Sequence, residues 1–214
     1  MKKIKIAIFD ADGTLFDSMP MYANIFSEIL YRDYKISRKE SKKYLISTAG
    51  LAIEKQIQHM LRKHRKKDAS EQLKEEFYRI ARKKKPTIFK DVIPTLKKLK
   101  HLKLFLSSGN SQELLNLRVR QFNLEKYFEE WLGFNGFKDK SEHLDHLIKK
   151  LKIKKEEFSK TSVYVADGSH DMAIARKYKI TSFGRIGTLT KKELLDSGAV
   201  YTISDFTKLM QHIK

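Results

Sequence analysis

Beyond residue 92, short apolar segments alternate with amphipathic ones, and this alternation leaves few folds open to the chain. Continuous apolar stretches predict strands at 103–106, 131–134, 162–166, 181–183 and 200–203. Helical spacing predicts helices between them, at 92–100, 113–122, 144–151, 172–178, one capped by Thr190 with Glu193, and one from 205 onward. Strands that alternate with helices form βαβ units, so the sequence predicts a parallel sheet with helices packed on its faces.

A long helical block separates the first strand from all the others. Residues 4–9 are apolar enough for a buried strand, whereas residues 19–85 carry only helical spacing. Ser37 with Glu40 predicts a capping box for the second helix of this block, and Pro86 closes the block. We therefore predict an α/β protein whose doubly wound, Rossmann-like core comprises residues 1–17 and 87–214. An all-helical domain, residues 18–86, is inserted after the first strand.

The composition excludes several classes of protein. The 214 residues include no cysteine, so a disulfide scaffold, a thiolate zinc site and a cysteine nucleophile are ruled out. No apolar run reaches the ~18 residues of a membrane span, and the N-terminal apolar stretch is too short for a signal peptide. We expect a cytoplasmic protein with no membrane association, and the sequence does not indicate its oligomeric state.

The chain is strongly basic, with a formal net charge of +19. The dense basic segments lie at 62–67, 82–85 and 149–155, and they lack interleaved aromatic residues. Specific nucleic-acid binding is therefore not expected. We retain two interpretations of this positive charge. It forms a solvated lysine-rich surface, or it creates an electrostatic field that attracts small anionic substrates.

Small polar and acidic residues follow three of the predicted strands. The segments are Asp10–Thr14, Ser107–Asn110 and Asp167–Asp171. In an open parallel sheet, ligands bind beyond the carboxyl ends of the strands, near the point where the strand order reverses. Carboxylates gathered at that edge repel one another unless a cation lies among them, and oxygen ligands with room for water suit Mg²⁺.

Asp10 and Asp12 have a spacing that suits covalent catalysis. If the extended backbone continues past the strand, side chains two residues apart point the same way, and Gly13 then permits a turn. One carboxylate could then act as a nucleophile while its neighbour donates and accepts a proton.

The segment Phe9-Asp10-Ala11-Asp12-Gly13-Thr14-Leu15 resembles the first motif of the haloacid dehalogenase-like superfamily, most of whose members are phosphatases. Later motifs of that family match in order. Ser108, or alternatively Ser107, matches the hydroxyl after the second core strand, and Lys140, or alternatively Lys138, matches the family's lysine. Asp167 and Asp171 match the acidic pair, although Ala166 replaces the glycine that usually precedes it.

The resemblance implies an Mg²⁺-dependent phosphatase that acts on a small phosphorylated metabolite. Asp10 would attack phosphorus and form an aspartyl-phosphate, and Asp12 would act as the general acid and base. The Asp10 carboxylate, the Asp12 backbone carbonyl and Asp167 would hold Mg²⁺, with Asp171 in its second shell or bound through water. Catalysis would further use Ser108 as a phosphate ligand and Lys140 as a counter-charge.

Two further roles follow from the resemblance. The helical insert resembles a C1-type cap, which closes over the active site and selects the substrate. Thr48 and Gly50 occupy a loop that faces the substrate in many relatives, so we expect them to influence specificity. Gly109 and Asn110 are expected to donate hydrogen bonds to the phosphate.

Other functions fit parts of the same pattern. A phosphomutase would return the phosphoryl group to the substrate rather than to water. A phospho-accepting regulatory module also combines an acidic cluster with a lysine, but the large insert and the chain length disfavour it.

Overall fold

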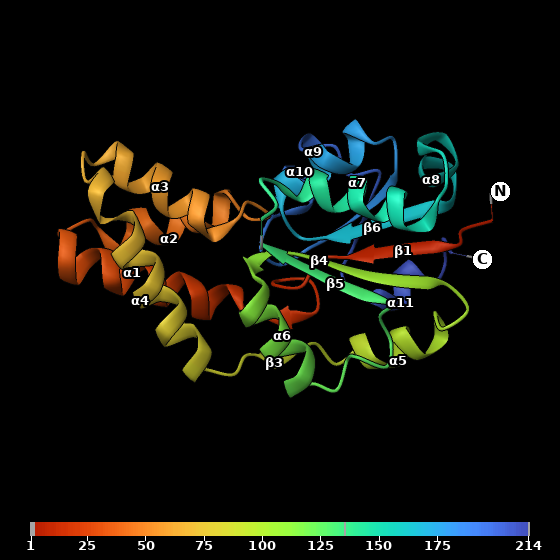
Figure 1. Ribbon diagram of the computed structural model, residues 1–214, viewed down its shortest axis with the longest axis horizontal. Coiled ribbons are helices and arrows are strands. Elements are labelled where there is room, and N and C mark those ends of the chain that lie inside the picture. The colour runs from red at the N-terminus through yellow and green to blue at the C-terminus, as the bar shows by residue number, and fades with distance from the viewer. Residues whose placement is uncertain (1–2, 135, 214) are drawn as a thin grey trace.

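The computed structural model describes residues 3–134 and 136–213 and contains a six-stranded parallel sheet in the order β5-β4-β1-β6-β7-β8 (Figure 1). Its strands are β1 (Ile6–Phe9), β4 (Lys103–Ser111), β5 (Glu130–Phe134), β6 (Ser162–Ala166), β7 (Thr181–Arg185) and β8 (Tyr201–Ile203). The chain leaves β1 toward β4 and β5 and later returns to β6 on its other side, so the order reverses at β1. The predicted doubly wound α/β fold is confirmed.

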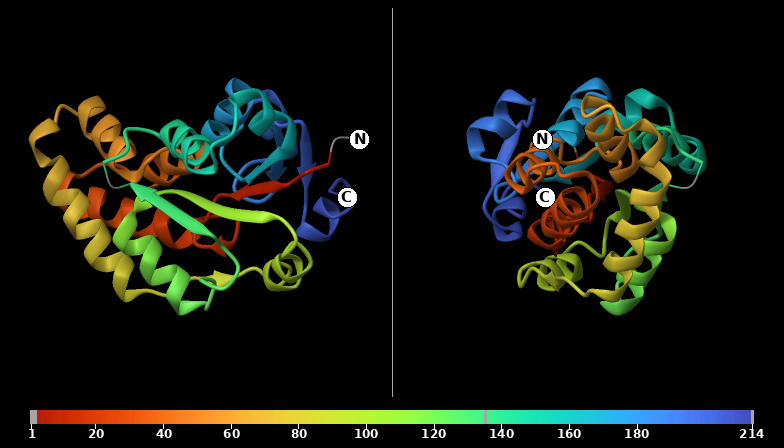
Figure 2. Two further views of the ribbon diagram at one scale, coloured as in Figure 1. Left: turned by 45° about the vertical axis from the view of Figure 1, so that its right-hand side comes forward. Right: turned by 90° about the vertical axis from the view of Figure 1, so that its left-hand side faces the viewer.

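Helices cover both faces of the sheet (Figures 1 and 2). One face carries α5 (Val92–Lys98), α6 (Gln112–Gln121) and α11 (Phe206–Leu209). The other carries α7 (Lys140–Leu151), α8 (Lys155–Thr161), α9 (Ser169–Lys177) and α10 (Lys191–Asp196). The structure therefore has three layers, as burial of a parallel sheet on both sides requires.

Strand β1 shows why its sequence is apolar throughout. Ala7 and Phe9 belong to the apolar cluster on the α5 side, whereas Ile6 and Ile8 belong to the cluster on the α7 side. Side chains alternate between the faces of a strand, so a strand covered on both sides needs apolar residues at every position. This burial fixes the position of the polar residues that follow.

The helical block lies beside one end of the sheet (Figure 1). It contains α1 (Met19–Tyr34), α2 (Arg38–Ser47), α3 (Ile53–Lys63), a short 3₁₀ turn (Lys67–Ala69) and α4 (Ser70–Lys83). These helices share an apolar cluster that includes Phe26, Ile57 and Phe77 and that extends to Leu114 of α6. Among the described residues, no helix combines the length and apolarity that crossing a membrane requires.

A short antiparallel pair of strands, β2 (Phe16–Asp17) and β3 (Thr87–Ile88), joins the two ends of this block. Asp17 pairs with Thr87, so the chain enters and leaves the helical block at one place. The sequence did not predict this pair, because two residues per strand are too few to show a period.

One local prediction was incorrect, one helix was not predicted, and one capping box was confirmed. Ser37 precedes α2 but makes no side-chain capping bond, and Glu40 instead pairs with Lys63 and His64 of the neighbouring helix. The short helix α8 was not predicted, because Phe158 is its one buried residue and no apolar period develops. The capping box of Thr190 with Glu193 is present.

We predict that the Asp91–Arg185 pair contributes strongly to stability. The Asp91 carboxylate accepts bonds from both Arg185 amino groups at 2.9 and 3.0 Å and from the Phe206 amide at 2.6 Å. The Arg185 side chain is only 6% exposed, so Asp91→Ala leaves a buried cation unpaired and should lower the free energy of unfolding by about 3 kcal/mol.

Urea denaturation measures this loss. Asp33→Ala removes one of the two carboxylate partners of Arg32, whose side chain is 58% exposed, and is the matched control with an expected change below about 1 kcal/mol. Equal losses in the two variants would contradict the prediction.

Candidate active site

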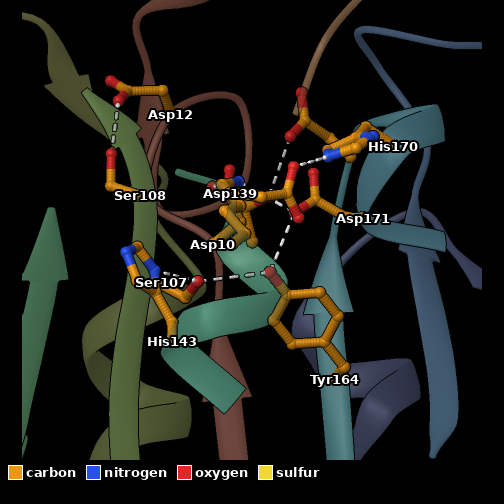
Figure 3. A network of polar contacts seen from close by, with 12 residues as sticks. Asp10, Asp12, Ser107, Ser108, Asp139, His143, Tyr164, His170 and Asp171 are labelled. Atoms are coloured by element: carbon orange, nitrogen blue, oxygen red, sulfur yellow. Dashed lines mark hydrogen bonds and ion pairs between the residues drawn. The ribbon is translucent and has the colours of Figure 1, made fainter. Parts of the chain in front are cut away.

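The register of the sheet brings the predicted strand-end residues to one edge. Phe9 lies beside Leu106 of β4 and beside Val165 of β6. The residues that follow each of these positions therefore emerge together, at the reversal point of the strand order. Three separate parts of the sequence meet there (Figure 3).

A buried ammonium group links two of these parts. Lys140 is the first residue of α7, and its Nζ lies 2.5 Å from Asp10 Oδ1 and 2.8 Å from Asp171 Oδ1. The three side chains are at most 5% exposed. Asp171 also accepts a hydrogen bond of 2.8 Å from the Tyr164 hydroxyl of β6.

Burial sets the electrostatics of this cluster. It raises the pKa of Asp10 well above its ordinary value; Lys140 opposes this effect, and Asp171 and Asp167 add to it. For Lys140, burial alone would lower the pKa, but the negative charges of Asp10 and Asp171 outweigh burial and raise it well above its ordinary value. The cluster thus holds more negative charge than one ammonium can balance.

Asp12 is held by Ser18, which directly precedes α1, and by residues of β4. Its Oδ1 accepts a hydrogen bond of 2.6 Å from Ser18, and its Oδ2 accepts one of 2.6 Å from the Asn110 amide. Ser108 Oγ also lies 3.5 Å from Oδ2. Asn110 thus contacts the candidate proton donor, a contact that the sequence did not predict.

The structure separates the alternatives that the sequence left open. Ser107 is buried on the other side of the strand and contacts His143 Nδ1 at 2.9 Å, whereas Ser108 faces Asp12 (Figure 3). Lys138 is exposed, whereas Lys140 is buried against Asp10. The geometry favours Ser108 and Lys140 for the predicted roles.

Asp167 has an oxygen that could bind a cation. Thr14 Oγ1 donates a 3.1 Å hydrogen bond to its Oδ1, while its buried Oδ2 has no hydrogen-bond partner among the described residues. A Cβ on Gly13 would overlap that same oxygen, so the first motif passes directly over it. Burial, together with Asp171, raises the pKa of Asp167 to about 6, against the opposing effects of Thr188, Lys140 and Thr14.

These observations fit a divalent cation. Asp10, Asp167 and Asp171 bring three buried carboxyl groups against the one ammonium of Lys140, which is an excess of two negative charges when all three are ionised. Within residues 3–134 and 136–213, no three acidic or histidine side chains form a metal-binding group. The predicted ligand set uses only two carboxylates, with a backbone carbonyl as the third ligand. It is therefore compatible with this finding.

The loop after α2 lies over the strand ends. Cβ atoms on Gly50 and Gly168 would overlap Asp171 and the Ala49 carbonyl respectively, and one on Gly109 would lie 2.9 Å from the Leu51 carbonyl. This close approach explains the small residues on both sides of the contact.

A small cavity remains between this loop and the sheet, with about 40 Å³ of room for water-sized molecules. It is lined by core residues Asp10, Asp12, Gly109, Asn110 and Lys140 and by Met19, Tyr22, Leu45, Ala49, Gly50, Leu51, Ile53 and Gln56 of the helical block. Gly50 therefore lies where the sequence predicted.

Thr48 is not among the lining residues, contrary to our expectation. Its hydroxyl donates a hydrogen bond to the Tyr44 carbonyl and accepts one of 2.8 Å from Gln56. These bonds stabilise the loop internally.

The sequence did not predict that Tyr164 and His143 contact Ser107 next to the charge cluster. In the sequence, the two residues look like ordinary buried residues of a strand and a helix. Burial, aided by the nearby charge of Lys140, lowers the pKa of His143 to about 3, so its ring stays neutral in the folded protein.

We predict that His143 makes folding sensitive to acid. An unfolded histidine binds a proton below pH ~6.5, whereas the folded one resists protonation down to a pKa of about 3. Stability therefore falls as pH drops through this window, by about 1.4 kcal/mol per pH unit from this residue.

Urea unfolding of the wild type and of His143→Gln, between pH 7 and pH 5, measures the effect. The wild type should lose about 1 kcal/mol more than the variant between pH 6 and 5. Exposed His59→Gln serves as the control and should follow the wild type. Parallel pH profiles for His143→Gln and the wild type would refute the assignment.

Comparisons with known proteins agree with this arrangement. A sequence model of the haloacid dehalogenase-like hydrolases matches residues 7–184. A protein of Caldanaerobacter subterraneus subsp. tengcongensis named "Putative pyrophosphatase PpaX" is 24% identical over 221 residues, which cover 99% of this chain and 96% of that protein.

Solved structures share the fold. A protein of Haemophilus somnus 129pt described as a "predicted phosphoglycolate phosphatase" has a TM-score of 0.80 at 18% identity, with 99% of each chain covered. A "putative beta-phosphoglucomutase" of Bacteroides vulgatus has a TM-score of 0.76 at 23% identity, covering 98% of this chain and 88% of its own. The chain is thus an enzyme of the haloacid dehalogenase-like hydrolase family.

Proposed function

We propose that this protein is an Mg²⁺-dependent phosphatase that hydrolyses a small phosphomonoester through an aspartyl-phosphate on Asp10. The observation that carries the proposal is the shared cavity. Asp10, Asp12 and Lys140 line this one cavity together with residues of the helical block. The pyrophosphatase and phosphoglycolate phosphatase names of two similar proteins support phosphoryl transfer to water.

Asp10 acts as the nucleophile in this proposal. Its carboxylate oxygen attacks phosphorus, a new P–O bond forms to Asp10, and the bond to the ester oxygen breaks. The contact with Lys140 keeps the carboxylate in place and favours its ionised form. Lys140, Ser108 and the Gly109–Asn110 segment stabilise the charge on the phosphoryl oxygens.

Asp12 moves the proton in both steps. It first protonates the leaving oxygen and then takes a proton from the water that attacks the aspartyl-phosphate. The 2.6 Å bonds from Ser18 and Asn110 fix the orientation of its carboxylate.

Asp10, the Asp12 backbone carbonyl and Asp167 are the residues that would hold Mg²⁺, with Asp171 close by. Bound there, Mg²⁺ would offset the excess carboxylate charge and orient a phosphoryl oxygen. The buried, unpartnered Oδ2 of Asp167 supports this assignment.

Residues 18–86 act in this proposal as a cap that opens to admit substrate. The paired strands β2 and β3 provide a compact joint, and the Ala49–Leu51 segment covers the strand ends. The cavity beneath this segment has room for roughly three water molecules, so the cap must move for any phosphate ester to reach Asp10.

We predict that Asp10→Asn abolishes phosphate release. Removing a covalent nucleophile should lower kcat by about 1,000-fold or more, because the aspartyl-phosphate cannot form. A phosphate-release screen over small phosphomonoesters and pyrophosphate measures this, with exposed Asp196→Asn as the control variant. Activity of Asp10→Asn near that of the wild type, with the fold retained, would disprove the mechanism.

Chelation with EDTA should stop turnover, and added Mg²⁺ should restore it, because the carboxylate cluster needs a counter-charge. Undiminished release of phosphate in EDTA would rule out the metal. A product that is an isomerised phosphate ester, with no inorganic phosphate, would instead identify a mutase.

A further inference from the structure

Tyr22 of α1 has an unused hydroxyl at the cavity. The residue lines the cavity and is only 4% exposed. Its buried hydroxyl has no hydrogen-bond partner among the residues that the structure describes. A buried hydroxyl without a partner costs free energy, so it is a candidate for contact with a ligand.

A buried positive charge lies behind Tyr22. Arg118 of α6 is 1% exposed, and its amino groups donate to the Ala81 carbonyl at 2.7 Å and to Gln121 at 2.9 Å. Within the described parts of the chain, no carboxylate lies at ion-pair distance from it, and its Nε is also unpartnered. The field of this guanidinium favours an anion on its side of the cavity.

Tyr22 stays a hydrogen-bond donor in this setting. Burial, with a further contribution from Asp12, raises the pKa of the phenol well above its ordinary value, and Arg118 opposes the shift. The hydroxyl is therefore protonated at neutral pH. Tyr22 and Asp12 line the same cavity, so the residue shares that space with the group that would protonate the leaving oxygen.

The other amide donors of the cavity are already engaged. Gln56 Nε2 donates to the Leu45 and Thr48 carbonyls at 3.1 and 2.9 Å, and Asn110 Nδ2 donates to Asp12. Among the described side chains that line the cavity, Tyr22 thus has a free donor, which the helical block contributes.

We propose that Tyr22 determines specificity by donating a hydrogen bond to an anionic oxygen of the leaving group, with Arg118 reinforcing the preference for negative charge. The preferred substrates are then compact phosphorylated anions that carry a second anionic group close to the phosphate. This inference rests on the proposed phosphatase activity and names the substrate class of that site.

Two probes of nearly equal size test the proposal. 2-Phosphoglycolate carries a carboxylate where 2-hydroxyethyl phosphate carries a neutral alcohol. The wild type should favour phosphoglycolate in kcat/KM. Tyr22→Phe keeps the ring, removes the hydroxyl, and should lower kcat/KM for phosphoglycolate by about 10-fold or more, with less than about 3-fold loss for the alcohol.

Tyr34→Phe, a change on the same helix that does not touch the cavity, is the matched control and should leave both values unchanged. Thermal unfolding confirms that each variant is folded. Equal losses on the two probes, no loss on either, or no preference in the wild type would each overturn the role of Tyr22.

A binding measurement separates this inference from the proposed function. If the wild type with Mg²⁺ hydrolyses neither probe nor any other phosphate ester, the phosphatase assignment fails. Calorimetry with phosphonoacetate and 2-hydroxyethylphosphonate then decides the subsite. Weaker binding of phosphonoacetate alone by Tyr22→Phe supports it, and any other pattern overturns it.

Discussion

The ammonium of Lys140, buried between the carboxylates of Asp10 and Asp171, is the interaction on which the site depends. It joins the end of β1 to the first turns of α7 and α9, so that the sheet edge and two helices share one charge cluster. Removing one partner of such a buried group leaves an uncompensated charge, which costs about 3–5 kcal/mol. The same burial makes the cluster chemically useful, because charges interact strongly where water is excluded.

The helical block completes this environment from above. Glycines on both sides allow its loop to approach the strand ends, and α1 carries Tyr22 to the same cavity. Lys55 of α3 also pairs with a residue of the α/β part of the chain, since its Nζ lies 3.6 Å from Asp139. In the proposed mechanism, the residues that select a substrate belong to one part of the chain, and the residues that transfer phosphate belong to another.

The sequence supported the sheet, the helical insert and the strand-end cluster, because buried parallel strands are apolar and their ends are marked by polar residues. It could not resolve Ser107 from Ser108, since one residue decides which face of the strand a side chain occupies. Glu40 did not cap α2 because tertiary partners, Lys63 and His64, compete for it. Tyr22 has the helical spacing of an ordinary buried residue, and only the three-dimensional structure shows that its hydroxyl is unpaired.

A crystal structure of the protein with Mg²⁺ and beryllium fluoride tests the central claim most directly. Beryllium fluoride mimics a phosphoryl group on a carboxylate, so the account predicts a beryllium atom bound to an Asp10 carboxylate oxygen. It also predicts Mg²⁺ at about 2.1 Å from Asp10, the Asp12 backbone carbonyl and Asp167. An unmodified Asp10, or a metal bound away from these residues, would contradict the account.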